Sequence, residues 1–101
     1  MNMTIFFYRW KIKSGKEEQF EQNWALVTKA IKDQCGSYGS RLHVAGNGDY
    51  VGYAQWPDVQ TREKCHAPAT QARSLMREAV EHFYPEEQFD VKIDLLSNLT
   101  G

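Results

Sequence analysis

Three side chains between positions 41 and 56 have the chemistry that a small-molecule site needs: Arg41, His43 and Trp56. An unperturbed imidazole titrates near about pH 6.5, so His43 is a candidate general base. A guanidinium stays charged and donates in a fixed fork, which makes Arg41 a candidate to stabilise a developing anion. The Trp56 indole would stack on a planar aromatic ligand. Together these residues predict a site that removes a proton from an aromatic molecule.

A β-hairpin has to bring these residues together. The segment GNGD contains Asn47-Gly48, which predicts a tight turn because both positions tolerate positive φ. The pairs that this turn predicts are Ala45 with Tyr50, His43 with Gly52, Arg41 with Ala54, and Gly39 with Trp56. Directly paired residues project to the same face of a sheet. We therefore expect Arg41 and His43 to share a face with Trp56 and the small residues Gly52 and Ala54.

The small residues on that face allow two interpretations. Gly52 and Ala54, beside long polar and aromatic neighbours, would leave a concavity in which a ligand binds. Alternatively, they let a helix approach closely, with Arg41 and His43 at a solvated rim. An Arg and a His on one strand are also typical of a surface or interface pair, and a Trp can simply anchor a core.

The first half of the chain predicts a strand, a helix and a hairpin. MTIFFYRW begins the chain, and Ser14 with Glu17 fits a capping box that starts the helix. The apolar stripe of this helix is Phe20, Trp24, Val27 and Ile31. Gly36 and Gly39 end the helix and lead into the strand SRLHVA, and the turn then leads into YVGYAQW.

The second half predicts further helix and a last strand. Asp58 can cap a short helical piece, and Pro68 opens a longer one that ends by Pro85. The residues that share a face of the longer piece are Ala72, Leu75, Met76, Ala79 and Phe83. Residues 88–96, QFDVKIDLL, alternate as an edge strand does. The order βαββαβ over residues 1–101 predicts one ferredoxin-like α+β domain, with two helices on one face of a four-stranded antiparallel sheet.

The first and third strands carry apolar residues on both faces, which predicts a partner. Tyr53 and Val51 oppose Ala54 and Trp56 on the third strand, and neither set carries a charge. Two helices cover only one face, and monomers rarely leave a large apolar patch open. A second copy packed face to face would cover it, so we expect a homodimer through the sheet. The alternative is that these aromatic side chains are simply exposed.

Composition excludes several other classes of protein. The net charge of −1 and the scattered Lys and Arg residues argue against nucleic acid. No apolar run is long enough for a membrane span, and the first fifteen residues do not form a signal peptide, so we expect a cytoplasmic protein. We expect Cys35 and Cys65 to be free thiols. No spaced ligand pattern predicts a metal, and nothing suggests a flavin or nicotinamide, so no cofactor is expected.

Nearly the whole chain resembles the antibiotic biosynthesis monooxygenase family of dimeric α+β barrels. The resemblance is in YRWKIKSGKEEQFEQNW, in GSRLH and in YVGYAQWPD, where a strand-ending Trp precedes a helix start. It implies a dimeric barrel with a pocket between sheet and helices on the Trp56 side. It also implies cofactor-free oxygenation of a phenolic, anthrone or quinol-like molecule, with His43 as base and Arg41 as anion stabiliser. The alternatives are a non-catalytic ligand-binding dimer and a haem-binding or haem-degrading relative.

The chain departs from this family at three positions. Oxygenases of the family carry Asn four residues before the Trp, and here that residue is Gly52. Haem-degrading relatives carry Trp and His at the positions of Cys65 and Leu75. His66 lies next to the first of these and completes the candidate ligand-binding set, since it would ligate iron if a kink at Pro68 shifted the register; haem binding is the weaker alternative.

Overall fold

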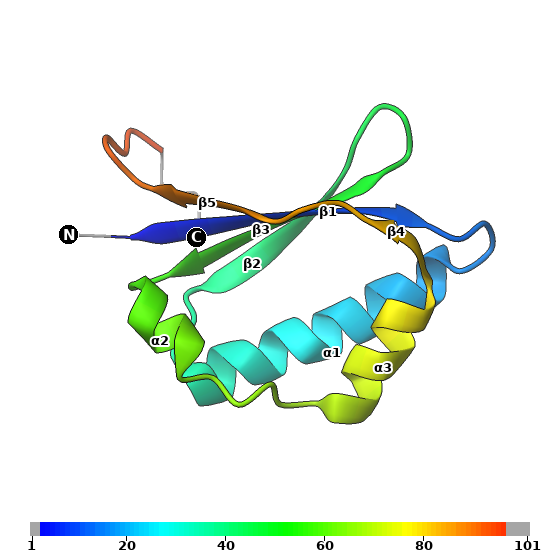
Figure 1. Cartoon of the computed structure of the whole chain (residues 1–101), viewed down its shortest axis with the longest axis horizontal. Helices are drawn as coiled ribbons and strands as arrows, with labels where there is room; N and C mark the ends of the chain where they lie inside the picture. The colour runs from blue at the N-terminus through cyan, green and yellow to red at the C-terminus, as the bar shows by residue number, and fades with distance from the viewer. Residues whose placement is uncertain (1–2, 97–101) are drawn as a thin grey trace.

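A five-stranded antiparallel sheet forms one layer of the protein, and helices cover one of its faces (Figure 1). The computed structural model describes residues 3–96. The elements in chain order are β1 (Thr4–Ile12), α1 (Glu17–Cys35), β2 (Gly39–Val44), β3 (Tyr50–Trp56), α2 (Val59–Glu63), α3 (Thr70–Glu78), β4 (Val80–Phe83) and β5 (Glu87–Asp90). The strand order is β2-β3-β1-β4, and β5 also pairs with β1. This arrangement confirms the predicted ferredoxin-like α+β fold.

The predicted last strand is two short strands on one edge of β1. β4 pairs with the end of β1 at Trp10–Ile12, and β5 pairs with its beginning at Thr4–Phe7. Pro85 lies between the two strands, where its missing N–H cannot support a ladder. Because β4 begins at Val80, the predicted long helix ends earlier than expected, at Glu78. The last regular strand ends at Asp90. No helix of the described chain is long and apolar enough to cross a membrane.

Helix α1 begins without the predicted capping box. Its N-cap residue is Lys16, no side chain caps it, and Gly15 before it has φ +84°. Glu17 and Glu18 in the first turn interact favourably with the helix dipole. The helix ends, as predicted, at Gly36, which adopts the left-handed conformation of a C-cap.

Asp58 caps α2 as predicted, because its carboxylate accepts a hydrogen bond from the Thr61 amide at 2.7 Å.

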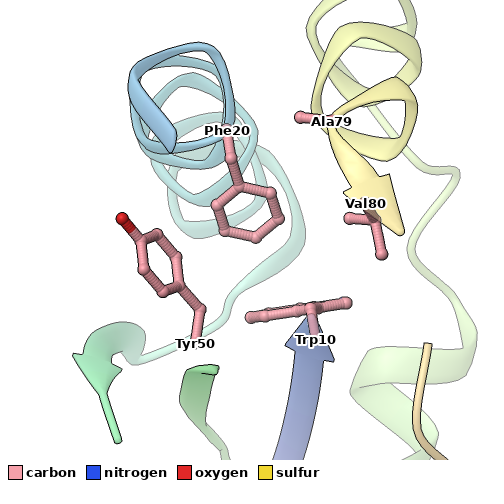
Figure 2. Packing of buried hydrophobic residues seen from close by; sticks show 5 residues of the cluster. All are labelled: Trp10, Phe20, Tyr50, Ala79 and Val80. Carbon is pink, nitrogen blue, oxygen red and sulfur yellow. The ribbon is translucent and has the colours of Figure 1, made fainter. Parts of the chain in front are cut away.

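Two clusters of buried side chains join the helices to the sheet. In the first, Phe20 of α1 lies over Tyr50 and Trp10, beside Ala79 and Val80 (Figure 2). The Phe20 ring is 5.0 Å from the Trp10 ring and 5.5 Å from the Tyr50 ring, and Phe20 is fully buried. The second cluster comprises Phe6, Ala54 and Trp56, with Ile31 and the two cysteines packed against it. Tyr8 packs against both clusters and so lies where the two meet.

The hairpin between β2 and β3 has a register that differs by one residue from the prediction. Tyr50 pairs with Val44, and the loop contains five residues, 45–49. The fifth loop residue, Asp49, is held by its neighbours: its amide donates to Asn47 Oδ1 at 3.0 Å, and Arg9 Nε donates to its carboxylate at 2.9 Å. Arg9 holds the pKa of Asp49 below its usual value. A shift of one residue turns every side chain of β2 to the other face.

The prediction that Cys35 and Cys65 are free thiols is wrong. The two residues form a disulfide across 30 residues of sequence, with their Cα atoms 5.2 Å apart. The bond joins the end of α1 to the segment that follows α2, and both cysteines pack against the cluster around Trp56. It therefore ties α2 to the helix layer.

Candidate functional site

A cavity of about 410 Å³ lies between the sheet and the helices. Its size suits a small ring system, since ligand pockets usually enclose about 300–1,000 Å³. Side chains of β1 and β3 form one wall, and α1, α2 and α3 contribute the others. The lining residues are Tyr8, Trp10, Trp24, Val27, Thr28, Ile31, Ser37, Ser40, Gly52, Ala54, Trp56, Arg62, Arg73, Met76, Arg77, Phe83, Tyr84 and Glu86.

Gly52 shapes the sheet wall because it gives room to an aromatic pair. The Tyr8 and Trp10 rings stack nearly parallel, with centroids 5.8 Å apart and planes 8° from parallel. A Cβ atom built on Gly52 would lie 2.8 Å from Cη2 of Trp10, closer than real contacts allow. The missing side chain is therefore required by the packing of Trp10. The concavity expected at Gly52 is partly filled: the Trp10 ring, and not a helix, occupies the space beside Gly52, and the cavity continues next to it.

A hydrogen-bonded chain of polar groups runs along the cavity from Tyr8 to Glu86. Arg62 Nη2 donates to the Tyr8 hydroxyl at 2.9 Å and to the Glu86 carboxylate at 2.9 Å. Its guanidinium carbon lies 3.9 Å from the centre of the Phe6 ring, a cation–π contact that fixes its plane. Arg62 is thus held on three sides by groups from β1 and from the segment before β5.

The Tyr8 hydroxyl is a hydrogen-bond donor at neutral pH. Burial raises the pKa of Tyr8, while the charge and hydrogen bond of Arg62 lower it, and the balance is a raised pKa. Because Tyr8 accepts from Arg62, its own proton is free to point to a bound molecule. An anionic oxygen at this place would therefore meet a hydroxyl that the adjacent guanidinium polarises.

The structure brings together only some of the residues that the sequence singled out. Trp56, Gly52 and Ala54 line the cavity, as expected for the pocket on the Trp56 side. Arg41 and His43 pair with Tyr53 and Val51. They therefore project from the opposite face of the sheet.

The predicted pairing of Arg41 with Ala54 and His43 with Gly52 is wrong, because the five-residue loop shifts the register. His43 is exposed, and its Nδ1 atom lies 3.3 Å from the carbonyl oxygen of Val51. Neither side chain reaches the cavity.

His66 lies at a second, smaller cavity of about 370 Å³ beside the disulfide. Its neighbours there include Cys35, Cys65 and Lys64, and it does not line the main cavity. The two positions at which haem-degrading relatives carry Trp and His do not support haem binding here. Cys65 is bonded to Cys35, and Leu75 is 37% exposed. Among residues 3–96, no three His, Cys, Asp or Glu side chains gather as ligands of a metal ion would.

Sequence reasoning missed Tyr8 and Arg62, although part of the signal was present. Tyr8 alternates with Phe6 and Trp10 on β1, so these three aromatic residues had to share a face. That face becomes the cavity wall only once β1 is paired with β3, where Tyr8 lies opposite Gly52. Arg62 carries no such signal, because α2 has only five residues and its orientation depends on tertiary contacts.

No protein-family model matches the chain, and no curated protein matches it. Solved structures match its fold. A candidate antibiotic biosynthesis monooxygenase of Bordetella bronchiseptica superposes with a TM-score of 0.73 at 19% identity, over 94% of this chain and 100% of that one. SnoaB of Streptomyces nogalater, a cofactor-independent oxygenase, superposes with a TM-score of 0.70 at 17% identity over the whole of both chains.

A further candidate of this kind, from Caulobacter crescentus, gives a TM-score of 0.71 at 12% identity over 92% of this chain and 91% of that one. The resemblance seen in the sequence is therefore confirmed at the level of the fold: the chain has the fold of the antibiotic biosynthesis monooxygenases.

Proposed function

We propose that the protein is a cofactor-independent monooxygenase that acts on a small phenolic, anthrone or quinol-like molecule in the cavity between sheet and helices. The observation that carries the proposal is the chain Tyr8–Arg62–Glu86 along a cavity walled by tryptophans. The fold shared with a cofactor-independent oxygenase supports the same reaction class.

The proposed chemistry needs only a proton acceptor and a place for an anion. Removing a phenolic or enolic proton gives an electron-rich anion that reduces O₂ directly. One oxygen atom becomes a new carbonyl group in place of a CH₂ group and the other leaves as water, so the substrate supplies all the electrons. Tyr8 and Arg62 stabilise the anion, and Glu86 is the lining carboxylate that can accept the proton.

The tryptophans would hold the ring system of the substrate. Trp24, Trp10 and Trp56 all line the cavity, from α1, β1 and the end of β3. Stacked or edge-on aromatic contacts contribute about 0.5–1.5 kcal/mol each beyond the burial of area. Gly52 leaves room for the Trp10 ring, which together with Tyr8 forms the wall against which a planar molecule would lie.

The experiment is oxygen uptake by purified protein with a panel of anthrones and hydroquinones and no added cofactor. Tyr8→Phe removes one oxygen atom and keeps the stacked ring, so we expect a fall of about a hundredfold in kcat, as for the loss of an oxyanion donor. Lys29→Gln, an exposed residue of α1 that does not line the cavity, is the control. Full activity in folded Tyr8→Phe, or silence across the panel, would sink the proposal.

A second candidate function is binding without catalysis. It is favoured by Gly52, because the resembling oxygenases carry an Asn there and Trp10 fills this space here. This function predicts that aromatic molecules quench Trp fluorescence while no oxygen is consumed.

The proposal includes a homodimer. On the open face of the sheet, the Phe7 ring lies 5.7 Å from Tyr53 and 5.9 Å from Phe89, in edge contacts that form an aromatic row. No described helix covers this row (Figure 1). A second copy, packed sheet to sheet, would bury it. The cytoplasmic location stays a prediction, and the disulfide favours an oxidising compartment instead.

A further inference from the structure

Two arginines of α3 line the cavity without an acidic partner. Arg73 and Arg77 lie one helical turn apart, so both project from one side of α3. Within residues 3–96, neither forms an ion pair, whereas Arg62 is already bonded to Glu86. Like charges four residues apart destabilise a helix by about 0.2–0.5 kcal/mol. This end of the cavity therefore has an excess of positive charge.

Arg73 carries a donor that the described residues leave without an acceptor. Its Nε atom is almost fully inaccessible to solvent and forms no hydrogen bond in the described chain. Its Nη2 atom makes only a long contact of 3.5 Å with the carbonyl oxygen of Pro68. A guanidinium offers its N–H donors in a fixed fork, and a carboxylate is the acceptor that this geometry matches.

Arg77 is positioned by an aromatic ring and keeps its hydrogen-bond donors for other partners. Its guanidinium carbon lies 4.7 Å from the centre of the Phe83 ring. Phe83 also lines the cavity, so the contact holds Arg77 at the wall.

We propose that the ligand of this cavity is an aromatic molecule that carries a carboxylate, which binds Arg73 and Arg77 while its ring lies among the tryptophans. The inference rests on the function proposed above and specifies its substrate as an aromatic acid. Tyr8 and Arg62, which line the same cavity, are then left for the phenolic oxygen. The carboxylate and the phenolic oxygen would then each have their own polar partners, and together these contacts would orient the ring.

The test compares two probes that differ in charge and little in shape: 1-hydroxy-2-naphthoate and 1-hydroxy-2-naphthamide. Isothermal titration calorimetry at neutral pH is expected to show that the acid binds the natural protein about tenfold or more tightly than the amide, the value of a charge-assisted hydrogen bond. Arg73→Gln and Arg77→Gln should each lower the affinity for the acid about tenfold and change that for the amide by less than about twofold.

Lys29→Gln is the matched control, because it removes one positive charge from the exposed face of α1 and should leave both affinities unchanged. Circular dichroism of each variant verifies its fold. Equal affinity for acid and amide, failure of both to bind, or an acid preference that survives in both folded arginine variants would overturn the inference.

Oxygen uptake, measured separately, distinguishes this inference from the proposed reaction. Binding of the acid through Arg73 and Arg77 without oxygen uptake by any probe keeps the inference and rejects the oxygenase. Oxygen uptake with uncharged quinols and no preference for the acid keeps the oxygenase and rejects the inference.

Discussion

The two faces of the sheet are built from the same central strands, yet one holds a cavity and the other an open aromatic row. On the helix side, Phe6 and Tyr8 pair with the small residues Ala54 and Gly52 of β3, and the space between this part of the sheet and the helices forms the cavity. On the other side, the Phe7 and Tyr53 rings meet edge to face, and no described helix covers them. The comparison shows that residue size, more than polarity, decides which face of these strands takes a ligand.

Charge also separates the two faces. The helix side gathers Arg62, Arg73 and Arg77 around the cavity. Arg41 and His43 lie on the open side, near its edge and exposed to solvent. The residue types that suggest chemistry are thus present on both faces, but the arginines of the helix side line a cavity, whereas Arg41 and His43 are exposed.

The largest effect is expected from the disulfide that fastens the helix layer. Replacing both cysteines, Cys35→Ser with Cys65→Ser, removes a link across 30 residues. The unfolded chain gains conformational entropy when the link is removed, which predicts a fall of about 3–4 kcal/mol in the free energy of unfolding. Urea denaturation measures it, with the slope against urea as a check on the unfolded state. A loss below about 1 kcal/mol would show that the bond is not a structural clamp.

On the open face, Tyr53→Glu tests the proposed dimer. A carboxylate in the middle of an apolar interface loses hydration without a partner, so the dimer dissociation constant should rise about a hundredfold or more. Sedimentation equilibrium measures it. Leu26→Glu is the matched control, since this leucine of α1 is 58% exposed on the helix layer. A monomeric natural protein, or an unchanged dimer in Tyr53→Glu, contradicts the sheet-to-sheet arrangement.

On the helix face, Gly52→Asn introduces the side chain that the resembling oxygenases carry. Its Cβ atom would lie 2.8 Å from Cη2 and 3.2 Å from Cζ3 of Trp10, so the ring must move. Overpacking of this kind predicts a loss of about 1–3 kcal/mol in the free energy of unfolding. At Gly46 an added Cβ meets nothing within 4 Å, so Gly46→Asn should be nearly neutral. Equal stability of the two variants would show that Trp10 adapts freely.

The sequence predicts those parts of the structure whose signals lie within a single helix or strand. The stripe from Phe20 to Ile31 fixes α1, and the alternation in β1 and β3 fixes which residues share a face within each strand. The register between β2 and β3 depends on one loop residue, Asp49, whose carboxylate is bonded to Asn47 within the loop and to Arg9 of β1. The spacing of GNGD does not indicate this tertiary contact. The sequence therefore predicts the β3 residues that line the cavity, but it places Arg41 and His43 of β2 on the wrong face of the sheet.

The same limit explains the missed cysteine pair and the missed arginines. Cys35 and Cys65 are 30 residues apart, and their proximity follows from how α2 folds back onto the end of α1. Nothing in the sequence singles out Arg73 and Arg77, because charged residues one helical turn apart are typical of a solvated face. Their place in the cavity wall follows only from the packing of α3.

The smallest effect is expected from His43→Ala, a substitution that tests which face of the sheet carries the activity. If catalysis belongs to the cavity, His43 is on the wrong side of the sheet, and its loss should change kcat/KM for oxygen uptake by less than about twofold. The His43 side chain is exposed and makes one polar contact, at 3.3 Å to the Val51 carbonyl, so stability should change by no more than about 0.5 kcal/mol. Tyr8→Phe, measured beside it on the other face, should remove most of the activity. A hundredfold loss in His43→Ala with Tyr8→Phe unaffected would move the reaction to the open face and make the dimer interface the place to look for the substrate.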